Sequence, residues 1–123
     1  MKDYSSHEIE LTLNIINATI VNCEKVKPKL KAGSSQLSLT TNRIHALETV
    51  KLLIEEKTTY IDEEQLNLSI IQITSILNKS QTGLSNAKAG SGVATRFNKL
   101  VVAMNVCLDY LNEAVKRANQ NQK

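Results

Sequence analysis

Two halves of the chain carry the same helical pattern of apolar residues, and this repetition constrains the fold more than any other feature. An offset of 57 residues places Lys31-Ala32-Gly33-Ser34 on Lys88-Ala89-Gly90-Ser91. The same offset aligns apolar residues on both sides of the motif: Ile9, Leu13, Ile16, Ile20, Leu47, Val50 and Ile54 with Leu66, Ile70, Ile73, Leu77, Met104, Cys107 and Leu111. Steps of three and four residues mark one face of a helix. The sequence therefore predicts an internal repeat of an αα-hairpin, over residues 5–57 and 62–118.

Polar residues at the expected starts of two helices support this division. Ser5 is followed three residues later by Glu8, and Asp62 by Gln65, which is the spacing of a capping box. Pro28 should end the first helix early or distort its last turn. The predicted helices span about residues 6–29, 35–57, 62–86 and 92–118.

Each Lys-Ala-Gly-Ser motif is predicted to form the turn between two helices. Lysine and glycine suit the end of one helix, and the serine can cap the next. A glycine-rich segment before a helix can also bind an anion. A hairpin turn explains both copies without a ligand, but if an anion site exists, its residues are Lys31, Ser34, Lys88 and Ser91.

The composition favours helices packed through aliphatic side chains. Hydrophobic residues make up 41% of the chain and charged residues 22%, which is typical of a globular domain. Only three Tyr and one Phe are present, so the core must consist mainly of Leu, Ile, Val and Ala. We expect an all-α fold: an antiparallel up-down-up-down four-helix bundle in a single domain, residues 1–123, with a frayed tail at 119–123.

Charge and hydropathy limit the partners and the compartment. The net charge is +3, with both signs interspersed, and the densest basic segment, residues 25–31, suits the end of a helix. This pattern does not favour nucleic-acid binding. No apolar run reaches the ~20 residues of a membrane span, and residues 1–10 lack the apolar core of a signal peptide. A cytoplasmic location is therefore expected, in which Cys23 and Cys107 act as buried thiols.

The chain lacks the residue patterns of common catalytic and metal sites. It contains no Glu-x-x-His of the di-iron bundles, no P-loop and no histidine at helical spacing from either cysteine. His45 and Glu48 form a single His-x-x-Glu pair, which suits an exposed helix surface. We therefore predict no catalytic residue, no metal site and no cofactor.

Two arginines occupy unusual positions in the pattern. Arg43 takes the stripe position that Leu100 holds in the second repeat. It is predicted either to form a salt bridge with a neighbouring helix or to mark a partner surface. Arg96 is expected in the first turn of the last helix, where a cation is electrostatically unfavourable. That placement suggests an acidic or anionic partner.

Helices 1 and 4 carry more apolar residues than one stripe requires. The additional residues include Leu11, Ile15 and Ala18 in the first and Val101, Val102, Val106 and Leu108 in the last. We expect them to form a homodimer interface or a surface for a protein partner.

The predicted function is a non-enzymatic interaction module. The alternatives are a ligand-binding or enzymatic bundle with a polar site near Arg43, His45 and Glu48, and a nucleic-acid-binding regulator. The size and architecture resemble those of small helical bacterial proteins such as bacteriocin immunity proteins. The Asn-, Lys- and Ile-rich composition is compatible with an AT-rich bacterial genome.

Overall fold

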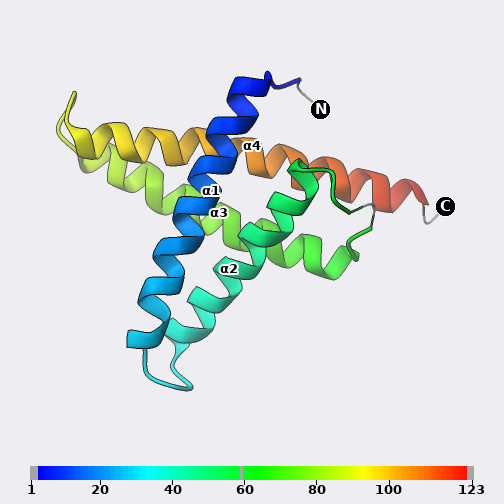
Figure 1. The fold of residues 1–123 in the computed structure, drawn as a ribbon, viewed down its shortest axis with the longest axis horizontal. Helices are drawn as coiled ribbons and strands as arrows, with labels where there is room; N and C mark the ends of the chain where they lie inside the picture. The colour runs from blue at the N-terminus through cyan, green and yellow to red at the C-terminus, as the bar shows by residue number, and fades with distance from the viewer. Residues whose placement is uncertain (1–2, 59, 122–123) are drawn as a thin grey trace.

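The computed structural model describes residues 3–58 and 60–121, and within them it contains four α-helices and no strand. The elements are α1 (Ser6–Val26), a 3₁₀ turn η1 (Lys27–Lys29), α2 (Ser35–Ile54), α3 (Glu63–Asn86) and α4 (Gly92–Asn121). Figure 1 shows two antiparallel hairpins, α1 with α2 and α3 with α4. The predicted all-α four-helix bundle built from two hairpins is confirmed.

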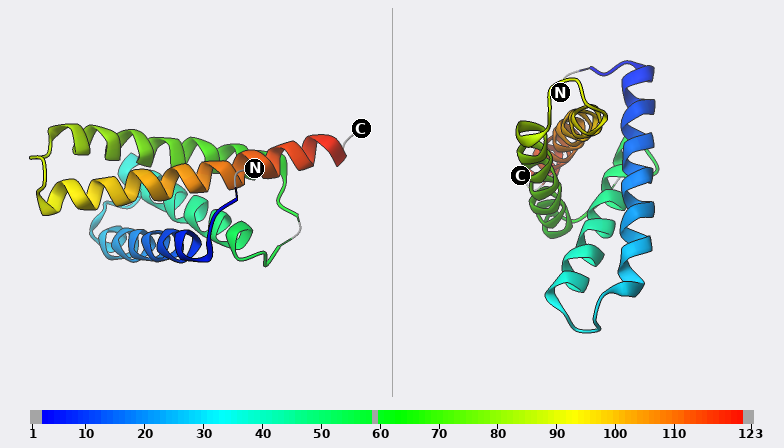
Figure 2. Two further views of the ribbon diagram at one scale, coloured as in Figure 1. Left: turned by 90° about the horizontal axis from the view of Figure 1, so that it is seen from above. Right: turned by 90° about the vertical axis from the view of Figure 1, so that its left-hand side faces the viewer.

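The two hairpins cross each other steeply. In Figure 1, α3 and α4 run along the longest axis while α1 descends across them, and Figure 2 shows α1 end-on when α3 and α4 are seen lengthwise. The contact between α3 and α4 is the most extensive. Between the hairpins, α1 contacts α4, and α2 contacts both α3 and α4. Because α1 crosses α4 partway along its length, the N-terminal part of α4 projects beyond the crossing.

The two predicted capping boxes have different outcomes. At the start of α1, Ser5 and Glu8 bond to each other's backbone N–H groups, which completes the box. At the start of α3, Asp62 accepts a hydrogen bond from the N–H of Gln65 at 2.8 Å. The Gln65 amide instead donates to Thr49 Oγ1 of α2 at 3.2 Å and to Ser69 Oγ at 3.3 Å. Gln65 therefore links two helices instead of closing a capping box.

The two Lys-Ala-Gly-Ser motifs adopt the same conformation. Lys31–Ser34 and Lys88–Ser91 each close with a serine N–H to lysine carbonyl hydrogen bond of 3.0 Å. Gly33 and Gly90 both have φ 78°, as the third residue of a type II turn requires. Each serine hydroxyl accepts from the N–H three residues later. The glycines thus lie in β-turns and not at helix ends. The internal repeat stays a prediction, which this shared geometry supports.

Three helix ends differ from the predicted bounds. The α-helical part of α1 ends at Val26, and Pro28 follows within η1, as its missing N–H and fixed φ lead one to expect. Helix α2 ends at Ile54, three residues before the predicted bound, while α4 continues to Asn121. Of the predicted frayed tail, residues 122–123 lie outside the described part of the chain.

The end of α2 is a Schellman motif without glycine. The N–H of Lys57 donates to the carbonyl of Leu52 at 3.0 Å, and that of Glu56 to Leu53 at 3.2 Å. Glu56 has φ 56°, in the left-handed region that glycine normally occupies. Because the segment contains no glycine, this early end could not be predicted from the residue types.

We expect the substitution Glu56→Gly to stabilise the protein by about 0.5–1 kcal/mol. The left-handed conformation costs a non-glycine residue about 1–2 kcal/mol, and the greater entropy of unfolded glycine offsets part of the gain. The matched control is Glu55→Gly, at φ −81°, which should destabilise. Urea denaturation measures the free energy of unfolding of both variants. If both variants were stabilised, or both destabilised, the left-handed conformation of Glu56 would not be the cause.

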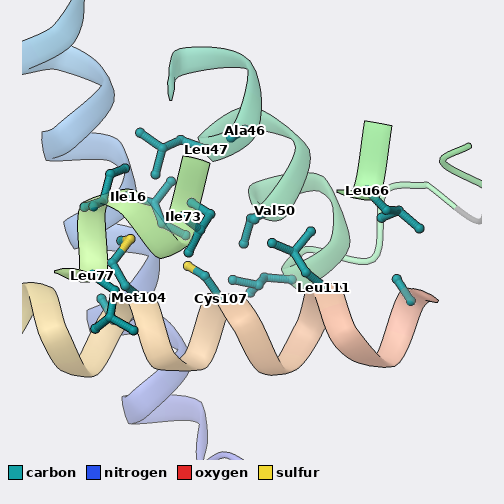
Figure 3. Close-up of a cluster of buried hydrophobic side chains, with 14 residues drawn as sticks. Ile16, Ala46, Leu47, Val50, Leu66, Ile73, Leu77, Met104, Cys107 and Leu111 are labelled. Carbon is teal, nitrogen blue, oxygen red and sulfur yellow. The ribbon is translucent and has the colours of Figure 1, made fainter. Parts of the chain in front are cut away.

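A continuous aliphatic core joins the two hairpins. Figure 3 shows its central side chains, which come from all four helices: Ile16, Leu47, Val50, Leu66, Ile73, Leu77, Met104, Cys107 and Leu111. Cys107 is fully buried, and burial raises the pKa of its thiol to about 12. Cys107 is therefore a packing residue with an unreactive thiol, as the sequence predicts.

Tyr4 attaches the start of α1 to α4. Its hydroxyl donates a hydrogen bond to Asp109 Oδ2, and its ring stacks on that of Tyr110 with centroids 6.4 Å apart. Burial, together with the Asp109 carboxylate, raises the pKa of Tyr4 to about 12. The phenol therefore stays protonated at neutral pH and keeps donating this bond.

Candidate functional site

A cleft of about 330 Å³ lies between the two hairpins. All four helices line it: Ile15, Ala18, Thr19, Asn22 and Cys23 of α1, Arg43 of α2, Ile76, Lys79 and Ser80 of α3, and Arg96, Phe97, Lys99 and Leu100 of α4. Most of its surface is apolar. The volume lies at the lower end of the range for small-molecule sites, which are also mostly apolar with a few polar groups.

The polar side chains of the cleft carry one sign of charge. Arg43, Lys79, Arg96 and Lys99 line it, and no Asp or Glu does. Within residues 3–58 and 60–121, no carboxylate lies within ion-pair distance of these four cations. Four unpaired cations around an apolar surface attract anions and raise their local concentration.

Arg43 is the most enclosed of the four cations. It is half-buried, whereas Lys79, Arg96 and Lys99 are exposed. Its Nη2 donates to Ser75 Oγ of α3 at 3.5 Å, the outer limit of a hydrogen bond, and its Nε is buried without a partner. The predicted salt bridge to a neighbouring helix is wrong for the described residues. Because protein atoms cover this Nε, it is an unsatisfied donor inside the protein, and the terminal nitrogens of the guanidinium are the groups that can meet a ligand.

Phe97 forms part of the apolar wall and depends on a glycine in the facing helix. A Cβ atom at Gly83 would lie 2.5 Å from Phe97 Cζ, so the ring occupies the space that any other residue would fill. Cζ of Arg96 lies 5.3 Å from the ring centroid, in range for a cation–π interaction. Gly83, which by itself weakens α3, is required for this close packing.

Cys23 places a thiol in the cleft wall. Burial raises its pKa, and the positive charge of Arg43 opposes this rise. The lining contains neither a histidine nor a carboxylate that could act as a base for the thiol. The thiol therefore has no neighbouring base in the lining that would activate it, and Cys23 offers a site for chemical labelling in the cleft wall.

The structure brings together only two of the residues predicted for a site. Arg43 and Arg96 both line the cleft. Helix α4 begins at Gly92, so Arg96 is its fifth residue and lies just beyond the first turn, in which it was predicted. His45 and Glu48 are exposed on α2 and do not line it.

The four residues predicted for an anion site in the turns also lie apart from the cleft. Ser34 and Ser91 cap helices, and Lys31 and Lys88 are exposed. The two turns are at the far ends of different hairpins. Each turn is therefore accounted for by its own hydrogen bonds.

Sequence reasoning missed Lys79 and Lys99, because single lysines on a helix give no signal of a shared cleft. Part of the surplus apolar surface of α1 and α4 also has its explanation here. Ile15 and Ala18 line the cleft, and Val106 is buried.

The described residues contain neither a group of metal-binding side chains nor a membrane-spanning helix. Within 3–58 and 60–121, no three His, Cys, Asp or Glu side chains are grouped so that they could hold a metal ion. In the same residues, no helix has the length and apolar character needed to cross a bilayer. Comparison of the chain with protein-family models, with curated proteins and with solved structures finds no match in any of the three.

Proposed function

We propose that this protein is a non-enzymatic binding protein whose site is the cleft between the hairpins, and that its ligand is a small anion with an apolar body. The observation that carries the proposal is Arg43, a half-buried cation with no carboxylate partner among the described residues, in a cleft lined by cations and aliphatic side chains. A cation partly withdrawn from water without a counter-charge is destabilising, and an anionic ligand would supply that charge.

The apolar residues of α1 and α4 in the lining support the same ligand. Ile15 and Ala18 of α1 and Phe97 and Leu100 of α4 line the cleft. They provide apolar contact, while Lys79, Arg96 and Lys99 contribute attraction at longer range. A ligand that combines both characters would use the whole lining.

Two matched dyes test this proposal. The first is 8-anilinonaphthalene-1-sulfonate (ANS), and the second is N-phenyl-1-naphthylamine, which has the same aromatic body without the sulfonate. Fluorescence titration should give tighter binding of ANS. Substitution of Arg43→Met should weaken ANS about tenfold or more and leave the neutral dye unchanged, since a hydrogen bond to a charged group is worth about 1.5–3 kcal/mol.

The control variant is Arg117→Met, because Arg117 is exposed on α4 and does not line the cleft. It should bind both dyes like the unchanged protein. Arg43→Met should also keep or raise the free energy of unfolding, because it removes an unpaired, half-buried charge while keeping an apolar stem. Equal affinity for the two dyes, or equal effects of the two arginine variants, would refute the proposal.

Self-association through helices 1 and 4 is a second candidate. Leu11, Val21 and Val26 on α1 and Val102 on α4 remain 45–56% exposed. Their exposure favours a homodimer that covers them. Light scattering with size-exclusion chromatography tests this, and a monomer at every concentration would exclude it.

A further inference from the structure

We infer that the ligand is a single-chain alkyl carboxylate of medium length, with its carboxylate on Arg43 and its chain along the apolar wall of the cleft. This inference rests on the proposed function and adds the chemical class of the ligand. It follows from the size of the cleft, from the half-buried Arg43 and from the apolar side chains that line the cleft.

The volume indicates a small ligand. A cleft of about 330 Å³ lies at the lower end of the range for small-molecule sites. A single alkyl chain such as that of decanoate suits such a site better than an amphipathic peptide helix, which is about 10–12 Å across with its side chains.

The chemistry of Arg43 selects the head group. Nη2 is only weakly bonded, and the two terminal nitrogens of a guanidinium match the two oxygens of a carboxylate in parallel hydrogen bonds. Arg43 is half-buried, whereas the three other cations of the lining are exposed, so water and salt screen their charges. The one cation that is partly withdrawn from water pairs fully with a monoanion, whereas a phosphate has a charge near −2.

The side chains along the cleft select the rest of the ligand. The apolar part of the lining consists of Ile15, Ala18 and Cys23 of α1 with Ile76, Phe97 and Leu100 of α3 and α4. The polar residues of the lining other than the cations are small: Thr19, Asn22 and Ser80. An unbranched alkyl chain buries apolar area against such a surface and needs no hydrogen bonds of its own.

Competition against ANS tests the inference, with four ligands used below their micelle-forming concentrations. Decanoate should displace ANS. Butanoate, which lacks most of the chain, and 1-decanol, which lacks the charge, should each be about tenfold weaker or more. Decyl phosphate should be weaker than decanoate. Tighter binding of decyl phosphate or of 1-decanol would overturn the assigned class.

Labelling of Cys23 provides a second readout that locates the ligand. Cys107 is fully buried, so a maleimide should react at Cys23, and decanoate in the cleft should slow that reaction. Arg43→Met should abolish the protection at the same decanoate concentration. Arg43→Lys, which keeps the charge without the planar fork, should give partial protection, and Arg117→Met should give full protection. Equal protection in all variants would place the carboxylate elsewhere and overturn the inference.

The two proposals fail in different ways. If ANS binds through Arg43 but decanoate neither displaces it nor protects Cys23, the ligand class is wrong and the anion-binding cleft stands. If ANS binding does not depend on Arg43, the cleft is not an anion site and both proposals are wrong.

Discussion

Replacement of Ile73 by alanine should lower the free energy of unfolding by about 2–5 kcal/mol. Ile73 is fully buried on α3 and belongs to the core that joins the two hairpins, where Figure 3 shows it among Ile16, Leu47 and Val50. The substitution removes apolar contacts and leaves a cavity that surrounding helices fill only in part. Because a domain of this kind is stable by about 5–15 kcal/mol, the loss is a large fraction of the total.

The control lies two residues away on the same helix. Ile71 is 61% exposed, so Ile71→Ala removes the same atoms from the other face and should change stability by about 0.5 kcal/mol or less. Ile73→Val should lie between the two, at about 0.5–1.5 kcal/mol. Urea denaturation followed by circular dichroism measures all three variants. Similar losses of stability for Ile71→Ala and Ile73→Ala would mean that Ile73 does not lie on the core side of α3 with Ile71 on the opposite side.

Local signals in the sequence predicted most of the secondary structure. The capping pair Ser5 and Glu8, the two Gly-Ser turns and the position of Pro28 act through neighbouring backbone atoms, so their effects are visible in a short window of sequence. The apolar stripes likewise marked most of the core, including Ile16, Ile73 and Leu111. The early end of α2 was missed because Glu56 adopts a conformation that its residue type disfavours.

The cleft could be predicted only in part because it depends on how the hairpins cross. The repeat identified Arg43 as a cation on an apolar stripe, and the helix register identified Arg96 as an unfavourable charge. Lys79 and Lys99 became part of a site only through contacts between residues far apart in the chain. The surplus apolar residues of α1 and α4 predicted a covered surface, but sequence alone does not distinguish a second chain from a cleft within one chain.

Gly83 connects the stability of the α3–α4 hairpin with the shape of the cleft. Its lack of a side chain allows the Phe97 ring to approach α3, with ring atoms 2.5–2.7 Å from the position of an added Cβ. A real Cβ cannot approach so closely, and the ring is rigid, so Phe97 must move as a whole. The ring lines the cleft, and any such movement changes the space available to a ligand.

We therefore expect Gly83→Ala to destabilise the protein by about 1–2 kcal/mol and to weaken ANS binding. Overpacking costs about 1–3 kcal/mol, and the better helix propensity of alanine returns up to about 1 kcal/mol. Gly92→Ala is the matched control, because an added Cβ there meets no atom within 4 Å. It should preserve both stability and dye binding.

A second substitution at Phe97 separates the contact from a general effect on the helix. In Gly83→Ala combined with Phe97→Leu, the smaller side chain leaves room for the added methyl group, so the cost of the two changes should be less than additive. If the two free-energy costs were additive, or if Gly83→Ala alone stabilised the protein, the Phe97 ring would not be in contact with residue 83. A coupling between the two positions, together with loss of ANS binding in the single variant, would place the wall of the cleft at the contact between α3 and α4.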